Sequence, residues 1–475
     1  RDAGLGLGDH TWMIDGLQTY VFENPSYLNR FSNIVYFERT GVNHGDNMGG
    51  ITWNPIGKLH MGVFSGIAVD NNLWNSSDSE GFYHSGGMPT ATAYQADLLD
   101  TTLPTNANRI DLMDPDGNNS AVPGGPDIRD QMTQQDVSII ASYSFATWGL
   151  GFSLGYASSW NDDKYSESSP TEQMDKYEFS SVQYDIGLGG YVTINRDMDV
   201  DFNLKLSLYS LGNSYKAIIP GETRTLNYES DGAMDIVAAG RFNWTYSRVH
   251  RFHFRAGFGL LNHSAAGAVS LVSVPVSASD EDTTIGYDRS ISWFSFGLSD
   301  EMRLSQNIKV FIGGNVVYKT LAYAYAVDSS VSLLNGNKYS KDLTYIMVPL
   351  VMGLEAQMSE NWTGRFGLTH VMYDPTTNDE ESTAGTSSSS DSMNLNEAAE
   401  TSLHLGLSYK LGNFRIDWLA NVDLFVRGPD FITGNSTERL GTGQDDISTP
   451  IATALAVTYN FDSLLREETP SLSPK

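Results

Sequence analysis

Apolar and polar residues alternate strictly in segments of about ten residues that recur along most of this chain. In residues 201–209 the two faces read Phe202, Leu204, Leu206 and Leu208 against Asp201, Asn203, Lys205 and Ser207. Residues 413–427 repeat the pattern. A period of two belongs to a strand with one apolar face and one wet face, and about ten tilted residues suffice to cross a bilayer. The alternation therefore predicts an all-β fold, a transmembrane antiparallel β-barrel.

The connections between the predicted strands alternate between short and long. Residues 195–199 and 411–413 are short, whereas residues 71–133 and 373–396 are long. An outer-membrane barrel places its short turns in the periplasm and its long loops outside the cell. About sixteen strands fit between these connections, at residues 32–40, 48–55, 58–70, 134–145, 149–160, 177–194, 200–216, 232–246, 252–261, 290–304, 308–327, 343–358, 362–372, 398–410, 414–426 and 448–461.

Composition narrows the possible partners. The chain has no cysteine, which excludes disulfides, thiolate metal sites and a cysteine nucleophile. Its net charge of -28 argues against nucleic acid as a partner. The acidic excess is concentrated in connections such as residues 374–400, which contain no lysine or arginine. We expect a solvated mobile loop there, or alternatively a surface that gathers cations outside the cell.

The first thirty residues do not alternate. Gly4, Gly6, Gly8, Asp9, Met13 and Asp15 lead into Tyr-Val-Phe-Glu-Asn-Pro-Ser-Tyr-Leu at residues 20–28. This opening resembles that of the FadL-like outer-membrane proteins, which transport long-chain fatty acids and hydrocarbons, and of their PorV-type relatives. The resemblance covers about forty residues, with Ser26 in place of the usual alanine and Asp15 in place of a doubled aspartate. It implies fourteen strands, so the expected number is 14–16, and a periplasmic hatch that carries Asn24 and Pro25.

The amino-terminal segment also needs burial on physical grounds. Its apolar side chains are too many for a free tail, and Pro25 restricts Asn24 to extended geometry at a turn. An ordinary turn without a functional role remains the alternative. We expect a hatch at residues 1–31, a barrel with long extracellular loops at residues 32–461 and a periplasmic tail at residues 462–475, with a signal peptide already removed.

Several apolar residues fall on the inward faces of the predicted strands. They indicate a path for a hydrophobic ligand, although packing of the hatch explains them equally well. Inward charges form a second group, expected to pair across strands and to solvate the lumen: Lys205, Arg241, Arg255, Glu301, Arg303, Arg415, Asp417, Asp423 and Arg427. The apolar group is Phe64, Ile140, Trp293, Leu321, Met347, Val351 and Phe425.

Two further features of the predicted strands are a proline within one strand and the aromatic end of the last strand. Pro349 lacks an N–H for the strand ladder, so it marks a bulge or a lateral opening, for which Gly62 and Gly66 are the other candidates. The last strand alternates up to Tyr459 and Phe461, which resembles the carboxy-terminal signal for outer-membrane assembly.

Evidence for catalysis or a metal is weak. Residues 114–119 place oxygen ligands around a glycine but lack the closing glutamate of a calcium loop, so a plain turn is favoured. His250 and His253 have no evident third ligand, and no nucleophile motif occurs, so we expect neither an enzyme nor a cofactor.

Three functions remain open for a protein in the outer membrane of a Gram-negative bacterium. They are a FadL-like transporter of hydrophobic small molecules, a PorV-like plugged scaffold for a surface or secreted protein, and a general diffusion porin. Outer-membrane lipid and lipopolysaccharide are the expected surroundings in each case.

Overall fold

Strands make up nearly all of the structure. The computed structural model describes residues 21, 23–40, 47–65, 133–163, 173–219, 222–273, 281–329, 338–371, 375–384, 387–396, 401–421 and 453–461. A short 3-10 helix, η3 (Pro25–Phe31), precedes the strands. The strands are β1 (Ile34–Thr40), β2 (Asn47–Ile56), β3 (Leu59–Ser65), β4 (Thr133–Ser144), β5 (Trp148–Asp163), β6 (Gln173–Asn195), β7 (Met198–Ile219), β8 (Glu222–Trp244), β9 (His250–Ser273), β10 (Glu281–Arg303), β11 (Ile308–Ser329), β12 (Lys338–Met347), β13 (Pro349–Gln357), β14 (Trp362–Val371), β15 (Pro375–Ala384), β16 (Ser387–Asn396), β17 (Thr401–Leu411), β18 (Phe414–Asn421) and β19 (Thr453–Asn460).

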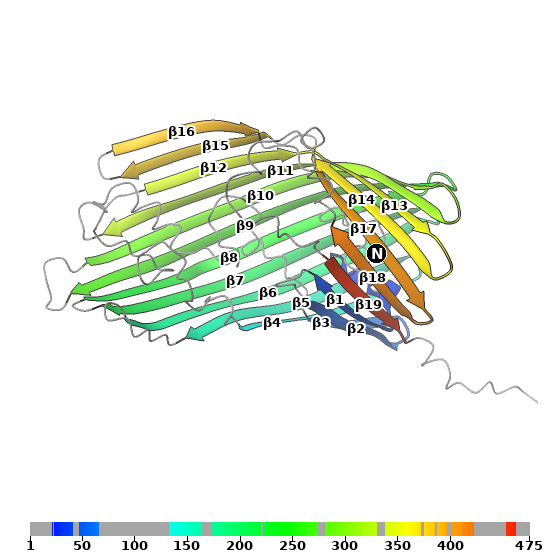
Figure 1. Cartoon of the computed structure of the whole chain (residues 1–475), viewed down its shortest axis with the longest axis horizontal. Coiled ribbons are helices and arrows are strands. Elements are labelled where there is room, and N and C mark those ends of the chain that lie inside the picture. The colour runs from blue at the N-terminus through cyan, green and yellow to red at the C-terminus, as the bar shows by residue number, and fades with distance from the viewer. Residues whose placement is uncertain are drawn as a thin grey trace, which may run out of the picture.

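Antiparallel pairing closes these segments into a barrel of sixteen wall strands (Figure 1). The nineteen segments make sixteen wall strands because three wall strands each consist of two segments. These are β12 with β13, which both pair with β11, β14 with β15, and β16 with β17. The barrel closes where β1 pairs with β19, from Ile34 opposite Asn460. Each of the sixteen predicted strands is present, so the number of strands derived from the alternation is confirmed, and the fourteen implied by the resemblance is too low.

The two faces of the wall differ as the alternation predicts. On β7, Phe202 is 51% exposed and its neighbour Asp201 is 5% exposed. The exposed face carries large apolar side chains on nearly every described strand, which forms a belt suited to lipid. Aromatic residues near the short turns also point outward, where they suit the headgroup level: Trp148, Trp244, Trp362 and Trp418. No helix among the described residues is both long and apolar enough to cross a membrane.

The strands extend further than the sequence predicted. β6 to β11 contain 22 to 24 residues each, about twice what a bilayer requires. The expectation of a mobile loop at residues 374–400 is corrected, because β15 and β16 form a hairpin in this region. Beyond the lipid belt both faces of a strand can meet water, so the strand continues without alternation.

The first and last strands of the wall, β1 and β19, pair with each other and close the barrel. Tyr459 on β19 packs against Phe414 of β18, with ring centroids 4.5 Å apart. The Phe461 backbone N–H donates to the Asn33 carbonyl oxygen at 2.9 Å. The terminal aromatic pair therefore lies at the closing strands, where an assembly role remains a prediction.

Candidate functional site

The lumen is occupied at its short-turn end by η3 together with Val21, Glu23 and Asn24. Asn24 caps the helix: it is extended, with φ -131° and ψ 98°, and its side-chain oxygen accepts hydrogen bonds from the Ser26 backbone N–H and hydroxyl. Pro25 occupies the first helical turn, where its missing N–H costs nothing. We call residues 24–31 the anchor segment.

Glycines of the wall allow the anchor segment to approach closely. A Cβ at Gly151 of β5 would lie under 3.0 Å from the Pro25 carbonyl carbon and the Ser26 nitrogen. A Cβ at Gly189 of β6 would overlap Asn24 and Pro25 in the same way. The Asn24 amide then donates to the carbonyl oxygens of Gly190 and Phe202, at 3.3 and 3.0 Å. The backbone of the anchor segment thus rests directly on β5 and β6.

The side of the anchor segment that faces β3 and β4 is apolar and closely packed. Val21 and Leu28 are fully buried there against Phe64 and Ile140, and Phe31 packs on the same cluster. Gly62 belongs to this contact, since a Cβ there would lie 3.3 Å from a Leu28 methyl group. Phe64 and Ile140, two residues of the predicted ligand path, therefore lie under the chain's own amino-terminal segment.

The opposite side of the anchor segment is polar. The Tyr27 ring stacks on Tyr191 at 4.9 Å, and the Arg30 guanidinium lies 4.3 Å over its other face. The Tyr27 hydroxyl donates to Asp201 at 3.0 Å, and the buried Arg241 holds the same carboxylate oxygen at 2.9 Å. Burial, reinforced by the Asp201 charge, raises the pKa of Tyr27 well above its ordinary value. The hydroxyl therefore stays protonated and remains a donor.

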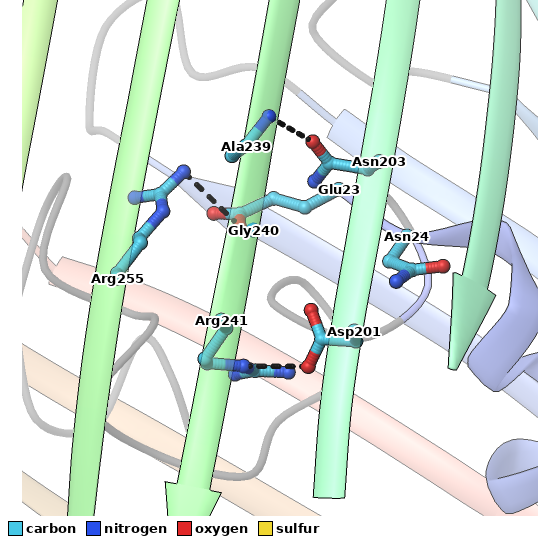
Figure 2. A pocket seen from close by; sticks show the side chains of 8 residues that line it. All are labelled: Glu23, Asn24, Asp201, Asn203, Ala239, Gly240, Arg241 and Arg255. Carbon is cyan, nitrogen blue, oxygen red and sulfur yellow. Dashed lines mark hydrogen bonds and ion pairs between the residues drawn. The ribbon is translucent and has the colours of Figure 1, made fainter. Parts of the chain in front are cut away.

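One ion pair extends from this polar side to β9. Glu23 Oε2 lies 3.4 Å from Arg255, and both side chains border a cavity of about 10 Å³ beside Asp201 and Arg241 (Figure 2). That volume holds about one water molecule. Asn203 lines the same cavity, and its side-chain oxygen accepts the Ala239 backbone N–H at 2.9 Å.

Other inward charges pair across the wall. Arg365 joins Glu355 at 2.8 Å and Asp417 at 3.1 Å, and Arg415 meets Asp417 at 2.8 Å. Further pairs are Lys205 with Asp185, Arg251 with Asp199 and Lys309 with Glu301. The predicted pairing across strands is therefore observed for Lys205, Arg241, Glu301 and Asp417. Arg415 instead pairs within its own strand, and Arg255 pairs with Glu23 of the amino-terminal segment. Arg303 is exposed, and Asp423 and Arg427 lie outside the described residues.

No metal centre forms within the described part of the chain. His250 contacts Asp300 at 2.8 Å, and His253 contacts Asn243 at 2.6 Å, so the two histidines have separate partners. The candidate calcium loop at residues 114–119 lies outside the described residues.

Two further apolar patches line the described part of the lumen. Val351 and Phe311 are each 1% exposed on the inner face of β13 and β11. Leu261 and Ile291 are buried opposite one another on β9 and β10, and the Trp293 ring covers Gly259 nearby. The alternation predicted the inward positions of Val351 and Trp293, whereas those of Phe311, Leu261 and Ile291 were not predicted. The side chains of Leu321 and Met347, together with residues Phe425 and Gly66, lie outside the described part.

The wall is interrupted at Pro349, two residues from Val351. β12 ends at Met347 and β13 begins at Pro349, so ladder pairing with β11 stops after Gly314 and resumes at Val317. The Asn315 side-chain oxygen is buried there without a hydrogen-bond partner. The next two wall strands are also interrupted at the level of Pro349. One is interrupted between β14 and β15, and the other between β16 and β17. Gly62, by contrast, pairs in regular register with Thr52 and Ile140.

The chain is distantly similar to several solved structures of membrane transport proteins. No protein-family model matches the chain, and no curated protein matches it in sequence. Among solved structures, the Pseudomonas putida toluene transporter TodX is 9% identical with a TM-score of 0.38, each chain being covered to 94%. The monoaromatic hydrocarbon channel CymD is 10% identical with a TM-score of 0.39 and 97% of each chain covered. The ferric yersiniabactin uptake receptor FyuA of Yersinia pestis is 9% identical with a TM-score of 0.36, over 90% of this chain and 79% of that one. Likeness at this level does not carry a functional assignment, which rests on the chain's own residues.

Proposed function

We propose that this protein is an outer-membrane channel for hydrophobic small molecules, of the FadL-like kind. The observation that carries the proposal is the set of buried apolar residues on the inner face of a wall whose other inward residues are largely polar and paired. Val351 and Phe311 form one apolar patch, and Leu261, Ile291 and Trp293 form another, in addition to Phe64 and Ile140 under the anchor segment. A diffusion pore for polar solutes has no need of such residues.

The Pro349 break supports a lateral exit from the patch of Val351 and Phe311 into the membrane. Val351 lies two residues from Pro349, and Phe311 is its diagonal neighbour on the inner face of β11. A hydrophobic molecule gains about 0.8 kcal/mol for each methylene removed from water, so an apolar route to lipid is favoured over an exit into the periplasm. In this hypothesis the missing N–H of Pro349 weakens the wall where the molecule leaves.

Uptake measurements test the proposal directly. Cells with the wild-type protein should accumulate a labelled long-chain fatty acid or monoaromatic hydrocarbon faster than cells without it, and Val351→Asp should remove most of the gain. Val351→Ala is the matched control, because it shortens the side chain but keeps the surface apolar. Equal uptake in all four strains would contradict the channel.

A plugged scaffold is the second candidate. β6 to β11 continue well beyond the lipid belt and present a large surface on the long-loop side (Figure 1). Such a surface could bind a secreted or surface protein without any transport. Recovery of a stoichiometric protein partner together with unchanged uptake would favour the scaffold.

A further inference from the structure

Two polar side-chain oxygens on the inner face of β10 and β11 have no hydrogen-bond partner in the part of the chain that the structure describes. Ser299 of β10 is 4% exposed, and its hydroxyl oxygen is one of the two. The other is the buried side-chain oxygen of Asn315 on β11. Ser299 pairs in register with Gly313, which lies two residues from Asn315 on the same face of β11. We call Ser299 and Asn315 the polar pair. A buried polar group without a partner costs free energy, so packing alone does not account for the polar pair.

The apolar patch of Val351 and Phe311 lies beside the polar pair. Gly313 pairs with Ser299 of β10 on one side and with Val351 of β13 on the other. These three residues form one inward row, in which Ser299 and Val351 are about 10 Å apart, or two strand spacings. Since Gly313 has no side chain, the row itself places no group between the Ser299 hydroxyl and the Val351 methyl groups. One small molecule at this row can therefore make a polar contact and an apolar contact together.

We propose that the polar pair binds one uncharged hydroxyl group of an otherwise hydrophobic molecule, while Val351 and Phe311 contact its apolar part. The bound hydroxyl donates to the Asn315 side-chain oxygen and accepts from the Ser299 hydroxyl. The inference rests on the proposed channel function and narrows its substrates to hydrophobic alcohols and phenols. It places their recognition where ladder pairing of β11 with β13 stops, beside Pro349.

The charges around the polar pair favour an uncharged ligand group. Glu301, the next inward residue on β10, forms an ion pair with Lys309 at 3.0 Å. Arg255, in the same inward row as Asn315, forms an ion pair with Glu23 at 3.4 Å. Both cations have a carboxylate partner, so a carboxylate ligand would have to break one ion pair to be neutralised. A carboxylate also has no hydrogen to donate to the Asn315 oxygen.

A hydrocarbon is disfavoured at the polar pair for a different reason. It covers both oxygens and gives neither a hydrogen-bond partner, whereas its hydroxylated analogue gives a partner to both. Sites with buried hydrogen-bonding groups discriminate in this way against analogues that lack the matching hydroxyl.

Uptake of labelled p-cresol and toluene tests the inference, because the two molecules differ by one hydroxyl group. The quantity compared is the ratio of the p-cresol rate to the toluene rate, each corrected for uptake by cells without the protein. Ser299→Ala and Asn315→Leu should each lower this ratio about two- to tenfold, as expected for one lost hydrogen bond. Toluene uptake should stay close to the wild-type rate in both variants.

Two variants serve as controls. Ser299→Thr keeps the hydroxyl group and should keep the wild-type ratio. Ser295→Ala removes a hydroxyl from another inward position of β10, opposite Val317, and should also leave the ratio unchanged. Competition tests the charge of the ligand: an excess of unlabelled phenol should slow p-cresol uptake, and the same excess of benzoate should not. Heat-modifiable migration in gels confirms that each variant has folded.

Each outcome decides for or against the polar pair. A ratio that falls in Ser299→Ala and Asn315→Leu but not in the two controls supports a hydroxyl site. Protein-dependent toluene uptake with an unchanged ratio in both variants refutes the site and leaves the channel standing. Equal loss of both compounds also refutes it, because the residues then shape the passage without recognising the hydroxyl. Equal competition by benzoate and phenol refutes the preference for an uncharged group. If neither compound enters faster than in cells without the protein, the channel and the site are both refuted.

Discussion

The backbone contact between Gly151 of the wall and the anchor segment gives the sharpest structural prediction. Gly151→Ala would place a Cβ under 3.0 Å from two backbone atoms, the Pro25 carbonyl carbon and the Ser26 nitrogen. Neither atom can rotate away, so the anchor segment must move off β5. Gly187→Ala on β6 is the matched control, because its Cβ would meet only the Ser153 side chain, whose hydroxyl can change rotamer.

The size of the effect follows from the contacts that a displaced anchor segment loses. Asn24 would lose two hydrogen bonds, at 3.3 and 3.0 Å, worth about 1 kcal/mol each. Partial exposure of Leu28, which is fully buried, adds up to roughly 1.5–3 kcal/mol. Docking of the anchor segment should therefore weaken by about 2 to 5 kcal/mol, which is at least a roughly 30-fold change in its equilibrium.

Hydrogen exchange followed by mass spectrometry measures this docking. Amides of residues 24–31 should exchange at least roughly 30-fold faster in Gly151→Ala than in the wild type, and at the wild-type rate in Gly187→Ala. Amides of β7 and β8 should be unchanged in both, because the wall does not depend on the anchor segment for its pairing. Equal protection of residues 24–31 in the two variants would refute the close backbone contact.

Three further predictions concern the belt, the Tyr27 hydroxyl and assembly. Leu204→Arg on the outward face of β7 should lower the free energy of unfolding in lipid vesicles by about 2–4 kcal/mol, while Thr147→Arg in an exposed turn should have little effect. Because burial raises the pKa of Tyr27 in the docked segment, ionisation of its hydroxyl above the ordinary tyrosine value of about 10 should weaken docking. The protection factor of residues 24–31, which is the exchange rate corrected for base-catalysed chemical exchange, should stay constant below that pH and fall above it. A constant protection factor across that range would argue against the buried hydroxyl. Phe461→Ala should reduce the amount of protein in the outer membrane, measured by fractionation, and an unchanged amount would show that the terminal aromatic is dispensable.

The alternation alone predicted the wall of this protein. A strand between lipid and water must place every second side chain outward, and this local rule predicts the outward position of Phe202 as readily as the inward position of Asp201. The same rule gave sixteen strands, and it stopped being informative where the strands leave the lipid. There β15 and β16 continue as a hairpin through a segment that composition alone predicted to be a mobile loop.

The contacts within the lumen could not be predicted from the local sequence pattern, because they join residues that are far apart in the chain. Arg365 and Asp417 are 52 residues apart, and only the register of β14, β17 and β18 brings them to 3.1 Å. Glycines at inward positions of β5 and β6 were visible in the sequence, but their use as a platform for Pro25 and Asn24 required the folded barrel. Sequence therefore determined which residues face lipid and that the amino-terminal segment needs burial. Tertiary structure decided which wall receives that segment, because pairing register and close backbone approach are properties of strands far apart in the chain.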